Sequence, residues 1–189
     1  MKMIDHLKLK NAERWQQMKI DPEVHPVLDR IAQRCIDNKT RYETVSQATT
    51  VPWFIIAVIH EREASGSWLA NLAQGDPWNS VSKHVPRGQG PFNSWEAAAE
   101  NALKRSPPFA AQWKDWSPAG ALTLLELYNG LGYANRELPS PYVWAGTNQY
   151  HRGKYVADGH FDPNAVDHQL GCAALIATMM LLDKTIQFS

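Results

Sequence analysis

One apolar segment constrains the fold of this chain more than any other feature. Residues 53–59, WFIIAVI, are all apolar, and they run directly into the polar tetrapeptide HERE, which ends at Glu63. A helix that is apolar on every side is normally surrounded by other elements, so the segment from Pro52 through Glu63 is predicted to form a central buried helix. Its polar end then emerges at the surface, most naturally at the floor or wall of a cleft.

The two carboxyl groups on this helix end are not equivalent. Glu61 and Glu63 would lie about 200° apart around a helix, so both cannot face the same cleft. A carboxyl group at a helix C-terminus meets the negative end of the helix dipole, and partial burial further penalises its ionised form. Both effects favour the protonated form that a general acid needs near neutral pH. The alternative is that both residues pair with Arg62 or Lys83 and solubilise the helix end.

The remainder of the chain reads as mainly helical. Residues 1–50 have the spacing of a helical scaffold, and Ser94 and Ser117 are placed to cap two later helices. A last helix is predicted over residues 164–184. A chain of 189 residues suits one domain, so the expected fold is α+β, mainly α, in a single domain over residues 1–189.

Two segments interrupt the helical pattern. Between residues 65 and 92, Gly and Pro break any helix, and pieces such as SVSKHV could pair as strands, which predicts a small loop-and-hairpin lobe. Residues 131–163 form a second irregular segment that is rich in Gly and Pro. Loops of that length within a compact domain are usually functional or mobile.

Charge and composition restrict the partners. The chain has 19 basic and 19 acidic residues, so no net field attracts nucleic acid or an anionic membrane. No run reaches the roughly 18 apolar residues that span a bilayer, and the charged N-terminus lacks the apolar centre of a secretory signal. Ala64 stands where a zinc-protease helix starting at His60 would need its second histidine. We therefore expect a monomer made in the cytoplasm, with no metal or other cofactor.

Three motifs in order resemble a known family. Arg-Glu-Ala-Ser ends the apolar helix, an irregular lobe follows, and ELYNGLGY comes after a later helix. This order resembles the lysozyme-like superfamily of peptidoglycan-cleaving enzymes, in particular goose-type lysozymes and lytic transglycosylases. QGDPW and HVPRG are similar to the NGDPL and HVPxG elements of phage-type endolysins. The resemblance covers roughly residues 51–182 and implies a lysozyme-like fold that acts on the cell wall after release from the cytoplasm.

The resemblance also implies roles for individual residues. By this match Glu63 is the catalytic acid, although Ala64 stands where Ser is usual. Tyr128 and Asn129 fall on the Tyr-Asn-x-Gly motif that lines the sugar-binding groove in the family. The residue that donates the proton and the residues that hold the sugar are thus expected in separate motifs of one cleft.

Asp76 and Ser82 match the Asp-to-hydroxyl step of phage lysozymes, although the gap of thirteen residues from Glu63 to Asp76 is longer here. The match implies that Asp76 activates water or stabilises positive charge and that Ser82 positions the water. Asp76 lies between Gly75 and Pro77, in a turn expected to be exposed, so its carboxylate should stay ionised. The alternative is that Asp76 only forms the turn.

Further binding residues come from both irregular segments. His84, near Lys83, could bind carboxylate or lactyl groups of the peptide stem, or it could belong to a solvated loop. Tyr150 and Tyr155 lie in a segment that mixes aromatic faces with side-chain hydrogen-bonding groups, as sugar sites do. A late Tyr also reaches toward the catalytic Glu in the transglycosylase branch.

The expected activity is hydrolysis of the β-1,4 bond between MurNAc and GlcNAc in peptidoglycan glycan strands. A lytic transglycosylase that leaves anhydro-muramyl ends is one alternative, because there a hydroxyl of the sugar replaces water and a single carboxyl group suffices. Asp76 favours hydrolysis. A non-catalytic wall-binding module is the alternative from another class, and it would keep the aromatic groove without needing an acid.

Overall fold

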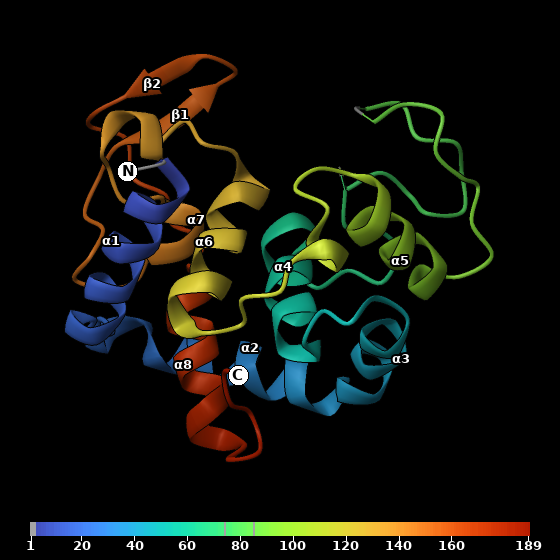
Figure 1. The fold of residues 1–189 in the computed structure, drawn as a ribbon, viewed down its shortest axis with the longest axis horizontal. Helices are drawn as coiled ribbons and strands as arrows, with labels where there is room; N and C mark the ends of the chain where they lie inside the picture. Colours follow the sequence, from blue (N-terminus) through green and yellow to red (C-terminus); the bar gives the residue numbers. More distant parts are fainter. Residues whose placement is uncertain (1–2, 74, 85) are drawn as a thin grey trace. The chain divides into compact units, whose positions relative to one another are not determined.

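The computed structural model describes residues 3–73, 75–84 and 86–189 (Figure 1). Its described part is mainly helical with one two-stranded antiparallel sheet, which confirms the predicted class, α+β and mainly α. The helices are α1 (Met3–Gln17), α2 (His25–Asp37), α3 (Lys39–Thr49), α4 (Trp53–Ala64), α5 (Trp95–Arg105), α6 (Pro118–Asn129), α7 (Pro141–Trp144) and α8 (Cys172–Leu182), and the strands are β1 (Lys154–Ala157) and β2 (His160–Asp162).

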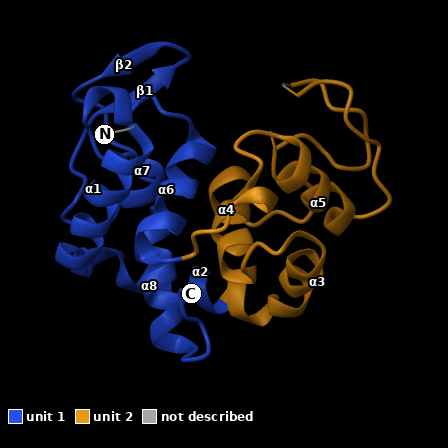
Figure 2. Ribbon diagram, viewed as in Figure 1, with its two compact units in different colours: residues 1–33, 117–189 blue, residues 34–116 orange. Residues whose placement is uncertain are grey.

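The chain forms two compact units (Figure 2). The first unit contains residues 1–33 and 117–189, and the second unit contains residues 34–116, so the boundary falls within α2. In the first unit α1 packs against α6, and α7 packs against both α6 and α8. In the second unit α3 packs against α4 and α5. The assignment of residues 1–189 to one domain stays a prediction.

Helix α4 is the buried helix that the sequence predicts. Every residue from Phe54 to Glu61 is buried, because the apolar run leaves no face suited to water. The helix ends at Ser65, which adopts a left-handed conformation with φ 50° and donates its backbone N–H to Glu61 O. The predicted start, Pro52, is the N-cap, and the helix begins one residue later at Trp53. The polar end of the helix is only partly buried from Arg62 onward.

The capping predictions were mostly right. Ser94 Oγ accepts the N–H of Ala97 at the start of α5, and Ser117 Oγ accepts the N–H of Gly120 at the start of α6. At the start of α4, however, Pro52 occupies the N-cap position without a side-chain cap. Thr49, at the end of α3, donates its hydroxyl to Val45 O within that helix.

Two predictions about the irregular segments were wrong. The described residues between 65 and 92 contain only an isolated β-bridge and no strand. The hairpin is formed instead by β1 and β2, in which Tyr155 pairs with Phe161. Helix α8 begins at Cys172 rather than at residue 164. The residues before Cys172 are not helical, and one of them, Ala165, accepts the N–H of Gly153 through a tertiary bond that helical spacing does not reveal.

Candidate active site

Glu63 lies in the last turn of α4, where the side chain is partly buried. The following loop returns to this turn: a Cβ atom added to Gly75 would lie 3.6 Å from the backbone carbonyl oxygen of Glu63. Asn71 closes the loop, since its carbonyl accepts the N–H of Gly75 and its N–H donates to Asp76 O over 2.8 Å. Asp76 therefore follows directly on a turn that touches the end of α4.

Glu61 has a structural contact. Arg34 Nη2 donates to Glu61 Oε2 and forms an ion pair with it. A Cβ atom at Gly66 would lie 3.0 Å from both of these atoms, so glycine leaves the space that the pair occupies. Glu61 is thus an ion-paired residue at the helix end, and Arg34 is one of its partners.

Asp76 accepts hydrogen bonds at both carboxylate oxygens. Oδ2 accepts the backbone N–H groups of Lys83 and His84 over 2.9 and 3.0 Å, and Oδ1 lies 2.6 Å from Nδ1 of His84. The backbone N–H of His84 is the main reason that the pKa of Asp76 lies below its ordinary value, while partial burial opposes the shift. Asp76 is buried, so the prediction of an exposed turn was wrong. The lowered pKa nevertheless agrees with the expectation that its carboxylate is ionised.

Ser82 is buried and stabilises the same loop. Its hydroxyl donates to Pro86 O over 2.8 Å and accepts the N–H of Gln89 over 2.9 Å. A hydroxyl oxygen has two lone pairs, so one acceptor position remains in addition to these bonds. The role of Ser82 in positioning water stays a prediction.

The predicted site residues therefore fall into two groups. Glu63, Asp76, Ser82 and His84 all belong to the second unit, and three of them share one loop. The remaining predicted residues belong to the first unit; these are Tyr128, Asn129, Tyr150 and Tyr155.

Tyr128 and Asn129 form the C-terminal end of α6. Tyr128 is partly buried, whereas Asn129 is exposed and donates its side-chain N–H to Ser140 Oγ over 3.2 Å. Gly130 follows with φ 93° and ends the helix. The role of Tyr128 and Asn129 in lining a sugar-binding groove stays a prediction.

Tyr155 packs into an aromatic cluster in the hairpin of the first unit. Its ring centroid lies 5.2 Å from that of Tyr133 and 5.3 Å from that of Phe161, both in edge-to-face arrangements. Its hydroxyl donates to Gly132 O over 3.3 Å and accepts Nε–H of Arg136 over 3.0 Å. These contacts hold the ring in place and explain its orientation without a ligand. The role of Tyr155 in binding sugar stays a prediction.

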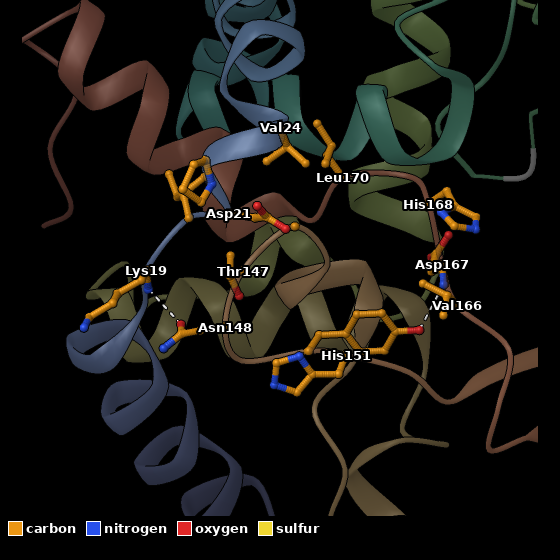
Figure 3. Close-up of a pocket in the computed structure, with 14 residues that line it drawn as sticks. Lys19, Asp21, Val24, Thr147, Asn148, His151, Val166, Asp167, His168 and Leu170 are labelled. Carbon is orange, nitrogen blue, oxygen red and sulfur yellow. Dashed lines mark hydrogen bonds between the residues drawn. The ribbon is translucent and has the colours of Figure 1, made fainter.

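Tyr150 lies on the wall of a cavity of about 470 Å³ in the first unit (Figure 3). Its hydroxyl donates to Gly153 O and accepts the N–H of Asp167. Three segments form the cavity, and Asn148 joins two of them by accepting Lys19 N–H over 2.8 Å. The lining residues are Lys19, Ile20, Asp21, Pro22, Val24, Gly146, Thr147, Asn148, Tyr150, His151, Val166, Asp167, His168 and Leu170.

Sequence reasoning missed Glu126, which is fully buried in α6. Asn11 Nδ2 donates to its Oε2 over 3.2 Å, while Oε1 has no hydrogen-bond partner among the described residues. Burial raises the pKa of this carboxyl group from 4.5 to about 7, against the opposing effects of Asn11 and Arg14. The signal in the sequence is a lone acidic residue within the apolar run LLELY, and complete burial keeps it away from a polymeric substrate.

The described residues contain no group of three or more His, Cys, Asp or Glu side chains placed to hold a metal ion. Within the same ranges, no helix is long and apolar enough to cross a bilayer. Comparison of the chain with protein-family models, with curated proteins and with solved structures found no match. The site must therefore be interpreted from its own chemistry.

Proposed function

We propose that this protein is a lysozyme-like peptidoglycan hydrolase that cleaves the β-1,4 bond between MurNAc and GlcNAc in glycan strands. One observation carries the proposal: the loop after α4 returns at Gly75 to the backbone of Glu63, and the next residue, Asp76, has a pKa below its ordinary value, which favours its ionised form. Glycoside hydrolysis requires such a pair, one carboxyl group that donates a proton and one negative charge opposite it.

In the proposed reaction, Glu63 donates its proton to the glycosidic oxygen as the bond to the anomeric carbon breaks. The negative charge of Asp76 stabilises the positive charge that develops on the sugar ring. The buried helix α4 supports this role because a fully packed element fixes the position of a side chain in its last turn. Tyr128 and Asn129 are proposed to bind the glycan strand, and no cofactor takes part.

The decisive experiment compares Glu63→Gln with the wild type in clearing suspensions of purified cell walls. We expect the variant to lose activity at least about 100-fold, because a positioned acid contributes on the order of 10²–10⁴ in rate. Glu100→Gln is the matched control, since Glu100 is half-exposed on α5 and forms an ion pair with Lys104 one turn away. Clearing by Glu63→Gln at the wild-type rate would show that Glu63 is not the acid.

The products separate the two enzymatic reactions. Mass spectrometry of wild-type digests should find reducing MurNAc ends, whereas anhydro-muramyl ends would identify a lytic transglycosylase. A wild-type protein that sediments with cell walls but releases no fragments would instead be a wall-binding module.

A further inference from the structure

The pair formed by His84 and Asp76 fixes the proton on one ring nitrogen. Nδ1 of His84 lies 2.6 Å from Oδ1 of Asp76. An ionised carboxylate can only accept a hydrogen bond, so Nδ1 must carry the hydrogen and donate it. In the neutral ring Nε2 then holds the lone pair, which makes it the basic atom of this side chain.

The other nitrogen of His84 faces solvent. The side chain is 75% exposed, and no described residue forms a hydrogen bond with Nε2. His60, in the same unit, is a useful contrast: it is fully buried, Nδ1 lies 2.9 Å from Tyr42 Oη, and Nε2 lies 2.9 Å from Ser67 O. Of these two histidines, His84 is the one that combines a held ring with an accessible acceptor atom.

Asp76 is itself poorly suited to take a proton. Three N–H groups already donate to its two oxygens, and these bonds are the reason for its low pKa. A weak base of this kind stabilises charge and orients a neighbouring group better than it removes a proton from water. A histidine oriented by an aspartate through Nδ1 is the arrangement in which Nε2 acts as a general base.

We propose that His84 Nε2 is the general base that activates water for hydrolysis and that Asp76 orients the imidazole ring. This inference rests on the proposed glycoside hydrolase function. The water oxygen bonds to the anomeric carbon while its proton passes to Nε2, and the glycosidic bond breaks as Glu63 protonates the leaving oxygen. His84 then returns its proton to solvent and Glu63 takes one up, so the net reaction is addition of one water molecule across the bond.

The test uses His84→Asn in the full chain with soluble glycan-strand fragments as substrate. The amide of Asn can donate to Asp76 in place of Nδ1–H, but it offers no base in place of Nε2. We expect kcat to fall at least about 100-fold with KM nearly unchanged. Addition of imidazole to His84→Gly should restore part of the rate. The matched control is His25→Asn. His25 is exposed on α2 and is far in sequence from the loop that contains His84.

Two results would overturn the inference. If His84→Asn keeps the wild-type kcat, His84 only holds Asp76 in place; if its KM rises while kcat is kept, His84 binds the peptide stem. Thermal melting would check that each variant is folded. If His84→Gly does not fold, the kinetics of His84→Asn decide the question alone. A wild type that cleaves, with Glu63→Gln inactive and His84→Asn active, would reject this inference and leave the proposed function intact.

Discussion

At the scale of one residue, Gly132 leaves room for the ring of Tyr155 in the aromatic cluster with Tyr133 and Phe161. A Cβ atom there would lie 2.9 Å from Cε2 of Tyr155 and 3.1 Å from its hydroxyl oxygen. We expect Gly132→Ala to displace this ring and to lower the free energy of unfolding by about 1–3 kcal/mol, the usual cost of overpacking. Urea denaturation measures the change.

A double-mutant cycle tests the cause of that loss. With Tyr155→Leu in the background the clash is relieved, so Gly132→Ala should cost clearly less than it does alone. An equal cost in both backgrounds would mean that the ring of Tyr155 is not what the glycine accommodates.

Tyr42 and His60 allow a second prediction at this scale. Nε2 of His60 faces a backbone carbonyl and must carry the ring hydrogen, so Nδ1 is the acceptor for the hydroxyl of Tyr42. Tyr42→Phe would leave this buried nitrogen without a donor, at a cost of about 1–3 kcal/mol in the free energy of unfolding. Chemical denaturation monitored by circular dichroism should show the loss, and an unchanged midpoint would mean that this hydrogen bond does not stabilise the fold.

At the scale of elements, the cap of α5 is the simplest quantity to test. Ser94 Oγ lies 3.1 Å from the N–H of Ala97 and satisfies a backbone donor that the helix itself cannot. Ser94→Ala should lower the free energy of unfolding by about 1 kcal/mol, and Ser94→Gly by only a few tenths. Equal losses in the two variants would show that the backbone conformation at this position, and not the hydroxyl, stabilises the start of the helix.

The elements that the sequence predicts well are those whose cause is local. The apolar run of α4 and the hydroxyl caps of α5 and α6 are properties of neighbouring residues, and they were correctly located. The start of α8 was misplaced because residues before Cys172 are held by bonds to residues 150 and 153. The hairpin was misplaced because Tyr155 and Phe161 pair with each other and with Tyr133, which the spacing of apolar residues did not reveal.

The same distinction applies to the candidate site. Glu61 and Glu63 could be separated by helical geometry alone, and the ion pair of Glu61 with Arg34 agrees with that separation. The low pKa of Asp76 was expected, but from exposure, whereas it arises from three N–H donors in a folded loop. That loop is a tertiary arrangement, so the orientation of His84 could not be read from the sequence.

At the scale of the whole molecule, Glu126 couples stability to pH. Its carboxyl group is protonated in both folded and unfolded chains at a pH well below 4.5. As the pH rises, the unfolded form ionises near 4.5 but the folded form only near 7, so the free energy of unfolding falls across this window. The loss approaches about 3 kcal/mol above the window, at 1.36 kcal/mol for each unit of pKa.

Glu126→Gln should remove this slope. Thermal or urea unfolding of the wild type and the variant between pH 4.5 and 8 would measure the slope. The difference in the free energy of unfolding between the two proteins should be smaller at acid pH and larger at alkaline pH. Parallel pH profiles would mean that the buried carboxyl group does not titrate in this range.

His60 gives the second unit the opposite dependence. Burial lowers its pKa from 6.5 to about 4, so the stability that the neutral ring contributes is present above pH 6.5 and is lost as the pH falls toward 4. Acid should therefore increase amide hydrogen exchange from α3 and α4 relative to α1 and α6, and alkali should do the reverse. A protease added at different pH values would consequently cut different halves of the same chain first, and the pattern of fragments would act as a record of the pH at which the protein was opened.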